Sequence, residues 1–528
     1  MRVLDRNNAE TLEQAAPRRN ERIVAVEATA LGLVVLLGLG VRLLGLTAYG
    51  IWFDEGYHVA LVRLPTVGAM LEAVLSNPPS DPLYVLVLRG WVGLFGHGDT
   101  EVRLLSVLLS TATLPAAYWL GRVMAGGAVG LLGALLFAVS PYAVELGQEA
   151  ALYTLAALAT TAALAAGWRW RTTGRGAGLY VLLAVVAIYS HYVVAVILAL
   201  FALLAPVLAP RHPVESSIFK TSPSREANGR YSESRWAAAH ALVFIAWLPW
   251  LLALGAHLMT TSLPRVALAH RATWLDVQDA LMQYTAGTAA RQAQEWAVIW
   301  PGLAASGALL ALGLVAPGRG RRGAWVIAAI AAALLFLPAV VSHFTGLWLF
   351  VPHFLLFLLP ALMVVLACGA LWLLGRGFAG WALFGALLGI WLWVQVIGLQ
   401  FYYRNPPHGN DGLRTLAARL HQAGPDDLVV VTPPALTPTL AQYYAGPVHG
   451  LPADFDLRTV YLPYDPAGWT AQSLTVLDAL VPGHARLWLV YRPENDEGGA
   501  LLRTMQRRYH QDLALPYEYA TLYRFSVP

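Results

Sequence analysis

The feature that most constrains this chain is a succession of long apolar runs over its first 400 residues. The first run, from about Ile23 to Leu46, is long enough to cross a bilayer, which takes about 20 apolar residues in an α-helix. Only 12% of the 528 residues are charged, whereas soluble domains carry about 25%. The sequence therefore predicts an α-helical protein that crosses a membrane many times.

Basic residues indicate which loops face the cytoplasm. They gather in the tail 1–22 and in the loops 168–175, 210–236 and 318–323. Because cytoplasmic loops carry an excess of Lys and Arg, we expect a plasma-membrane protein with a cytoplasmic N-terminus and an extracytoplasmic C-terminus. About eleven spans are expected, at 23–46, 101–121, 127–142, 150–168, two within 178–209, 237–255, 294–315, 324–342, 348–372 and 381–400.

The segment 178–209 leaves two topologies open. One long tilted span would place the next loop outside, and two short spans that turn near Ser190-His191-Tyr192 would place it inside. The basic residues of 210–236 favour two spans. The same loop is rich in Ser and poor in apolar residues, which predicts a flexible cytoplasmic linker.

Between the first two clear spans, an outer loop covers about residues 47–100. It contains an amphipathic stretch at 56–75 and a short apolar segment from Pro82 to Phe95. Fourteen apolar residues are too few for an ordinary span. We expect two helices that lie in the outer membrane interface, and the alternative is that they are loop elements without a role in a site.

The composition changes after the last run, so we expect three parts: the tail 1–22, a membrane domain at 23–400 and an extracytoplasmic domain at 401–528. The stretches 426–432 and 487–491 have the pattern of buried strands, and 410–423, 435–445 and 499–510 that of helices. Alternation of helix and strand predicts a small α/β domain.

Two adjacent carboxylates, Asp54 and Glu55, follow the first span. A carboxylate at the rim of a helix bundle can act as a general base if it reaches an acceptor hydroxyl. Tyr57 is close by in sequence, and His58 lies one helical turn beyond Asp54. The alternative is that both acids are solvated loop charges.

A second acidic cluster is formed by Glu145 and Glu149, with Tyr153 a further turn along. If this stretch is helical, the three side chains share one face, on the same side of the membrane as Asp54. Charges that face a bundle interior at a span entrance usually mark a substrate path. The alternative is a pair of interfacial charges.

Candidate cations on the outer side are few. Arg103 opens a span and could bind a phosphate or pair with an acid such as Glu101. A lone His at the end of a span is more often structural than a ligand, and three His on distant loops do not make a metal motif. Carboxylates could hold a divalent cation, although no ligand spacing predicts one. The candidates are Arg63, Arg89, Arg103, His191, Arg291 and His353.

Several classes of site have no motif in the sequence. There is no P-loop, no Gly-x-Gly-x-x-Gly after a strand and no His-Glu-x-x-His. Cys368 is the only cysteine, so there is no internal disulfide and no thiol metal site. The net charge is +4 and the basic residues lie in short loops, which argues against a nucleic-acid partner. A reaction would therefore take its activated substrate from the membrane.

The order of several short motifs resembles the GT-C membrane glycosyltransferases, and within them the bacterial relatives of the protein O-mannosyltransferases and of the lipid A aminoarabinose transferase. The resemblance covers roughly residues 23–400. The similar segments are Trp52-Phe53-Asp54-Glu55, Asn77-Pro78-Pro79 with Pro82-Leu83-Tyr84, Glu101-Val102-Arg103-Leu104-Leu105-Ser106, Ser140-Pro141-Tyr142, Gln148-Glu149-Ala150-Ala151-Leu152-Tyr153, Ser190-His191-Tyr192 and Leu359-Pro360-Ala361. Ala151 and His353 stand where members of the family often carry Arg.

The resemblance implies transfer of a sugar, with inversion, from a polyprenyl-phosphate carrier in the membrane lipid to a glycan, lipid or protein acceptor on the outer face. Asp54 would be the catalytic base, and Glu55 would help to shape the catalytic site. Acceptor, sugar or carrier phosphate would be bound by the remaining candidates, which are Tyr57, His58, Arg103, Glu149, Tyr153, His191 and His353. Arg103, His191 and His353 would be the candidates for the phosphate, which needs a cation because negative charge grows on the leaving oxygen as the glycosidic bond breaks.

Two other functions stay open from the sequence. A polytopic transporter or lipid flippase would place ionisable residues deep within its spans and repeat broken helices in two halves, whereas the carboxylates here gather at one surface. A catalytically inactive GT-C scaffold is compatible with Ala151 and with an outer domain that binds a partner.

Overall fold

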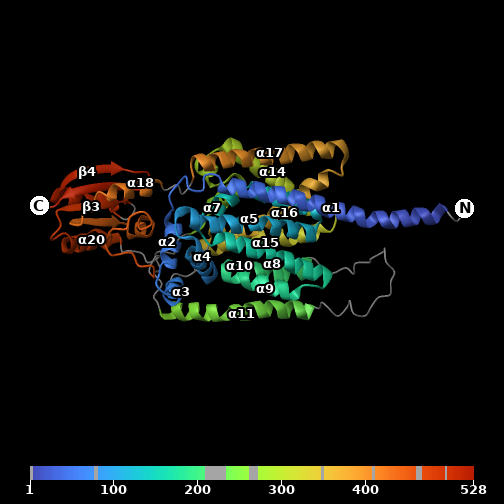
Figure 1. Ribbon diagram of the computed structural model, residues 1–528, viewed down its shortest axis with the longest axis horizontal. Helices are drawn as coiled ribbons and strands as arrows, with labels where there is room; N and C mark the ends of the chain where they lie inside the picture. The colour runs from blue at the N-terminus through green and yellow to red at the C-terminus, as the bar shows by residue number, and fades with distance from the viewer. Residues whose placement is uncertain are drawn as a thin grey trace.

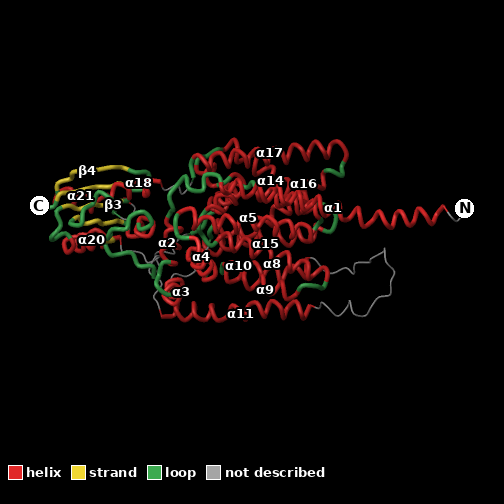
Figure 2. Tube along the Cα trace, in the orientation of Figure 1, coloured by secondary structure: helices red, strands yellow, loops and turns green. Residues whose placement is uncertain are grey.

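The chain forms a long helical bundle with a small sheet-containing domain at one end (Figure 1). Strands occur only in this terminal domain among the described residues (Figure 2). The N-terminal helix points away from the opposite end of the bundle (Figure 1). The computed structural model describes residues 4–76, 81–208, 233–260, 271–346, 350–406, 411–458, 466–493 and 496–528.

The bundle is built from apolar helices, several of which begin or end at glycine. Gly126, Gly174 and Gly346, which adopt positive φ angles, stand at helix ends, where glycine carries no steric penalty. The elements are α1 (Leu4–Leu43), α5 (Asp99–Met124), α6 (Gly127–Ala138), α7 (Pro141–Gln148), α8 (Tyr153–Thr173), α9 (Ala177–Ser190), α10 (Val193–Leu208), α11 (Glu233–Thr260), α12 (Trp274–Ala286), α13 (Thr288–Gln292), α14 (Trp296–Val315), α15 (Gly320–Thr345), the 3₁₀ helix η2 (Pro352–Leu358), α16 (Leu359–Leu373) and α17 (Gly377–Arg404).

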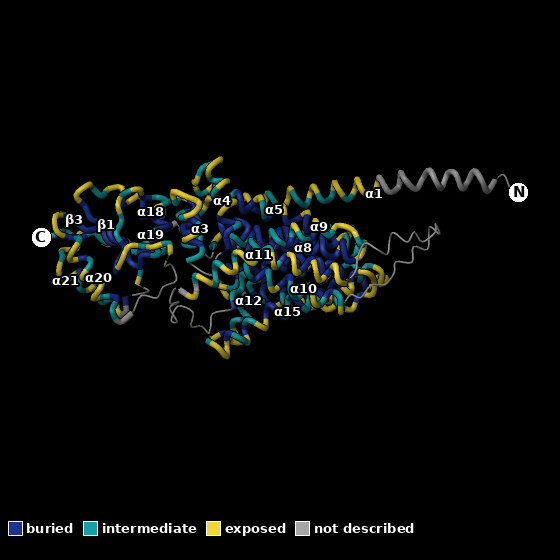
Figure 3. Tube along the Cα trace, turned by 90° about the horizontal axis from the view of Figure 1, so that it is seen from below, coloured by how far each residue is buried: buried dark blue, intermediate teal, exposed yellow. Residues whose placement is uncertain are grey.

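Burial separates a central set of helices from an outer set (Figure 3). α16 packs against α14, α6 and α5 and is almost wholly buried, whereas the apolar side chains of α1 are largely exposed. Exposed Leu33, Leu36 and Phe378 would be costly in water but match hydrocarbon. This distribution is that of a multi-pass membrane protein, as the sequence predicts.

Each of the eleven predicted spans coincides with a helix. Seven of the described helices are long and apolar enough to cross a membrane, or eight if the bent pair α6 and α7 forms one span. α9 and α10 are separate, shorter helices that break at His191 and Tyr192, near the predicted turn. The number of spans stays a prediction, and most of the expected linker 210–236 lies outside the described residues.

The outer loop differs from the prediction in its number of helices. It forms α2 (Phe53–Val62), α3 (Val67–Ser76) and α4 (Pro82–Phe95), so the amphipathic stretch is two helices and not one. Pro65 lies at the break, and proline removes a helical N–H donor. α4 has the predicted bounds. All three helices lie between the bundle and the terminal domain (Figure 1). The Asn-Pro-Pro motif at 77–79 lies outside the described residues.

The terminal domain is a five-stranded sheet with the order β2-β1-β3-β5-β4. β1 (Asp427–Thr432) pairs in parallel with β2 (His449–Gly450) and β3 (Arg486–Tyr491), and β5 (Thr521–Ser526) is antiparallel to β3 and to β4 (His510–Pro516). Alternate residues of β1 and β3 pack on α18 (Asp411–Leu420) on one face and on α20 (Pro466–Leu480) and α21 (Ala500–Arg508) on the other. The predicted small α/β domain is confirmed.

Two elements, one at the start of this domain and one within it, differ in extent from the expectation. The last long helix continues to Arg404, so it overruns the predicted boundary at 400. The predicted helix 435–445 is a 3₁₀ turn (Pro434–Leu436) followed by the one-turn α19 (Thr437–Leu440). Prolines at 433, 434 and 438 prevent a longer run of helical hydrogen bonds there.

The contact between α5 and α6 predicts a sensitivity to small substitutions. A Cβ added at Gly121 would lie 2.5 Å from the Gly130 Cα. Because close helix contacts in membranes depend on small residues, Gly121→Ala should destabilise the protein by about 1–3 kcal/mol, seen as a lower thermal unfolding temperature in detergent. Gly385→Ala is the control, since a Cβ there meets no atom within 4 Å. Equal unfolding temperatures for the two variants would contradict this packing.

Candidate active site

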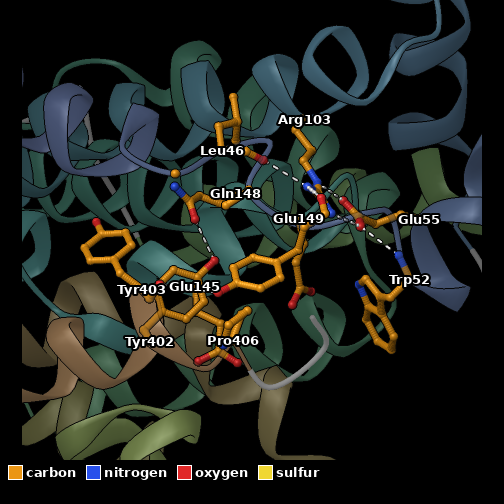
Figure 4. A pocket seen from close by; sticks show the side chains of 13 residues that line it. Leu46, Trp52, Glu55, Arg103, Glu145, Gln148, Glu149, Tyr402, Tyr403 and Pro406 are labelled. Atoms are coloured by element: carbon orange, nitrogen blue, oxygen red, sulfur yellow. Dashed lines mark hydrogen bonds and ion pairs between the residues drawn. The ribbon is translucent and has the colours of Figure 1, made fainter. Parts of the chain in front are cut away.

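The centre of the candidate site is the fully buried carboxylate of Glu55, in the first turn of α2. Its Oε1 accepts hydrogen bonds from Arg103 Nε at 2.8 Å and from the Ala150 backbone N–H at 2.9 Å. Its Oε2 accepts from Arg103 Nη2 at 2.7 Å and from the Trp52 N–H at 3.1 Å. Glu55 therefore joins three separate segments of the chain: the outer loop, α5 and the residues after α7 (Figure 4).

Arg103 uses its whole guanidinium group in this arrangement. Nη1 donates to the carbonyl oxygens of Leu46 and Tyr49, and Nη2 donates to Gly50 O as well as to Glu55. An arginine has five N–H donors, and all five are accounted for by these contacts. Arg103 pairs with Glu55 and not with its near neighbour Glu101, so its geometry suits holding the loop and leaves no N–H for a phosphate.

Glu149 follows α7 and does not continue it. α7 ends at Gln148, the Glu149 backbone is extended (φ −86°, ψ 135°), and the next helix starts only at Tyr153. The expectation that Glu145, Glu149 and Tyr153 share one helical face is therefore wrong. At this break the Ala150 backbone N–H donates a hydrogen bond to the Glu55 carboxylate. The segment that contains Glu149 is therefore joined to the segment that contains Asp54 and Glu55.

A cavity opens beside this junction, with about 510 Å³ of empty space including the part open to solvent. Glu145 Oε2 accepts a hydrogen bond from the Thr288 N–H at 3.3 Å, and Glu149 Oε2 is buried without a hydrogen-bond partner among the described residues. The cavity thus contains acceptors with unused capacity. Its lining residues are Gly45, Leu46, Ala48, Tyr49, Trp52, Glu55, Arg103, Glu145, Gln148, Glu149, Tyr402, Tyr403 and Pro406.

Asp54 lies next to Glu55 in α2 and is half-buried. It is within electrostatic range of Glu149. Its carboxylate forms no hydrogen bond or ion pair with the side chains of the described residues. Removal from water, and secondarily the neighbouring charge of Glu55, raise the pKa of Asp54 to about 7. A carboxylate with this pKa can take up a proton near neutral pH.

The two other candidates of α2 face its packed side. Tyr57 and His58 are both buried, and the His58 ring meets Tyr84 of α4 edge-on, with 5.4 Å between ring centroids. Burial lowers the pKa of His58 to about 4, so its imidazole is neutral at pH 7. Both side chains pack α2 against its neighbours.

The remaining candidates come from other elements. His353, in η2, lies over Tyr153 with ring centroids 5.2 Å apart, and also near Tyr142. Tyr142 is within electrostatic range of Glu145 and Glu149, but Tyr142, Tyr153 and His353 are not among the residues that line the cavity described above. His191 is buried between Phe354 and Phe357 and accepts the Val193 N–H, so it is packed as a structural residue.

Sequence reasoning did not assign Gln148, Tyr402 and Tyr403 to the site. Gln148 Oε1 accepts from the Tyr402 hydroxyl at 2.6 Å, and its Nε2 donates to the carbonyl oxygens of Arg42 and Leu44 (Figure 4). The available signal was a pair of tyrosines at the end of the last apolar run, where aromatic residues mark a membrane interface. Within the described ranges, no group of three or more His, Cys, Asp or Glu is placed to hold a metal ion.

The Glu55–Arg103 pair predicts a large effect on stability. Glu55→Gln leaves the Arg103 charge buried without its partner, which costs about 3–5 kcal/mol and should lower the thermal unfolding temperature of the purified protein. The control is Asp478→Asn, because both side chains of the Asp478–Arg508 pair are exposed and such a pair should contribute about 0–1 kcal/mol. A similarly small decrease in unfolding temperature for both variants would contradict the expected contribution of the buried pair to stability.

The comparisons with known proteins agree with this architecture. The family model described as dolichyl-phosphate-mannose-protein mannosyltransferase matches residues 77–222, and no curated protein matches the sequence significantly. ArnT from Cupriavidus metallidurans superimposes with a TM-score of 0.60 at 11% identity, over 94% of this chain and 98% of that chain. The archaeal oligosaccharyltransferase AglB from Archaeoglobus fulgidus gives 0.53 at 12% identity, over 94% and 74% of the two chains. The protein therefore has the GT-C fold of the membrane glycosyltransferases.

Proposed function

We propose that the protein is an inverting glycosyltransferase, with Asp54 as the general base that deprotonates an acceptor hydroxyl at the outer face of the membrane. The observation that carries the proposal is the position of Asp54. It is a half-buried carboxylate with a pKa near 7, directly beside the Glu55–Arg103 pair that lines the cavity. General bases work best when their pKa lies near the operating pH.

The donor in this proposal is a sugar linked to a polyprenyl phosphate. ArnT has been crystallised bound to undecaprenyl phosphate, and AglB in complex with dolichol-phosphate and an inhibitory peptide. Carriers of this kind reach an active site from the membrane, where the apolar surface of the bundle would hold the chain. The acceptor would be a glycan, lipid or protein hydroxyl from outside.

The proposed reaction exchanges one bond to the anomeric carbon for another. The acceptor oxygen gives its proton to Asp54 and forms the new C–O bond. The bond between the anomeric carbon and the phosphate oxygen breaks on the opposite face, and polyprenyl phosphate leaves with the electron pair. Attack opposite to the leaving group inverts the anomeric configuration. The carboxylates of Glu145 and Glu149 can accept hydrogen bonds from sugar hydroxyls.

Residues other than Arg103 must donate hydrogen bonds to the phosphate, because the N–H groups of Arg103 already bind Glu55 and the loop. We assign this role to His353 and Tyr153, whose rings lie against each other, with His353 also near Tyr142. Imidazole and phenol groups can both donate to a phosphate oxygen. A neutral His353 would donate through only one of its ring nitrogens.

The central test is Asp54→Asn in the purified full-length protein with a polyprenyl-phosphate sugar. An amide is nearly the same size but cannot take the proton, so kcat should fall by about 10²–10⁴-fold while the protein still binds the lipid phosphate. The control is Glu72→Gln, an exposed acid of α3 in the same outer loop. Unchanged transfer by Asp54→Asn would remove Asp54 as the base and favour an inactive scaffold or a lipid transporter.

The raised pKa of Asp54 predicts the pH dependence of the reaction. Only the deprotonated carboxylate accepts a proton, so kcat/KM should be half-maximal near pH 7, to which burial raises the pKa of Asp54. Below this pH it should fall about tenfold per unit. A pH–rate profile of the wild-type protein measures this limb, and an acid limb near pH 4 would contradict the buried position of Asp54.

A further inference from the structure

The terminal domain touches the outer loop directly beside Asp54. α19 of the domain packs on α2, and a Cβ added at Gly56 would lie 2.7–2.9 Å from three atoms of Thr439. The Phe455 ring meets Phe53 edge-on at 6.4 Å between centroids. The residues on both sides of Asp54 and Glu55 therefore contact the domain, and the glycine lets α19 approach this closely.

One tyrosine of the domain reaches the backbone of the loop itself. Tyr443 Oη accepts a hydrogen bond from the Ile51 N–H at 2.6 Å and donates to Asp99 Oδ2 at 2.8 Å. Gly50 O, the other polar atom of the same peptide group, accepts from Arg103 Nη2 at 3.0 Å. The Gly50–Ile51 peptide is thus held on one side by the bundle and on the other by the domain.

Asp99 fixes the tyrosine in turn. It opens α5, one turn before Arg103, and its carboxylate also receives Gln442 Nε2 at 3.2 Å and Arg414 Nη2 at 3.4 Å. The Arg414 guanidinium lies 5.8 Å from the centre of the Tyr443 ring. The hydroxyl of Tyr443 is therefore oriented by a carboxylate that belongs to the same helix as Arg103.

We infer that Tyr443 is a positioning residue, by which the C-terminal domain fixes the start of α2 and so the direction of the Asp54 carboxylate. Phe53, the first residue of α2, follows Ile51 by two residues, so rotation of the Gly50–Ile51 peptide would reorient the first turn. The inference rests on the proposed function in that Asp54 is taken as the base. It adds a role for the domain in the chemistry itself.

Loss of the hydroxyl should loosen this loop. Ile51 is fully buried, and a buried N–H left without its acceptor favours local opening. The first measurement is hydrogen exchange by mass spectrometry on the full-length protein in lipid nanodiscs, followed on peptides that cover residues 50–57. Tyr443→Phe keeps the ring and should speed exchange there by about tenfold.

The matched control is Tyr444→Phe, the same chemical change at the next residue. Tyr444 packs in the core of the domain, against the His421 ring, and not on the outer loop. This variant should leave exchange at 50–57 unchanged. Equal exchange in Tyr443→Phe and wild type, or equal acceleration in both variants, overturns the inference whatever the enzyme activity is.

The second measurement separates positioning from simple stability. Tyr443→Phe should lower kcat by about tenfold while KM for the polyprenyl-phosphate sugar changes less than twofold, because the hydroxyl contacts the loop and not the cavity. Faster exchange with unchanged kcat would show a clamp without a catalytic role and overturn the inference. If Asp54→Asn keeps full activity, the proposed function fails, and the exchange result still decides whether Tyr443 holds the loop.

Discussion

The buried ion pair between Glu55 and Arg103 is the interaction on which the outer part of the molecule depends. Taking two charges out of water costs several kcal/mol for each ion, and their attraction offsets this only when every remaining donor and acceptor is matched. Here the matching is complete: five guanidinium N–H groups meet three backbone carbonyls and the carboxylate, which also accepts two backbone N–H groups. The same pair therefore folds the loop 46–50 and fastens it to α5.

The pair also gives the two adjacent carboxylates, Asp54 and Glu55, different surroundings. Both oxygens of the Glu55 carboxylate accept hydrogen bonds from Arg103. The carboxylate of Asp54, one residue earlier, has no such bond to the described residues, and burial raises its pKa. Neighbouring acids whose environments differ in this way can take different roles in catalysis. Because every N–H of Arg103 is already used, Arg103 forms no ion pair with Glu145 or Glu149, which also line the cavity.

The sequence allowed the helical membrane class, the α/β nature of the last domain and the bounds of α4 to be predicted, because hydrophobic period and proline position are local signals. It did not reveal that Arg103 pairs with Glu55, 48 residues away, instead of Glu101. Nor did it reveal the break at Glu149, where four-residue spacing suggested a continuous helix. Both errors concern long-range packing: Gly147 lies tightly against Ser110 and Arg42, and the Ala150 N–H finds its acceptor in another segment. The family resemblance pointed to this region but carried no information on these connections.

The loop that leads into α2, and so to Asp54, is held by hydrogen bonds from two sides. Residues 44–52 contain no regular helix or strand, so their backbone groups need partners from elsewhere. The bundle supplies Arg103 and the domain supplies Tyr443, and they bind opposite ends of one peptide group. A domain attached only to recruit an acceptor would need no such contact. In this chain the peptide group that leads into α2 is held by two residues that are far apart in sequence, Arg103 and Tyr443, so the domain contributes directly to the position of the proposed base.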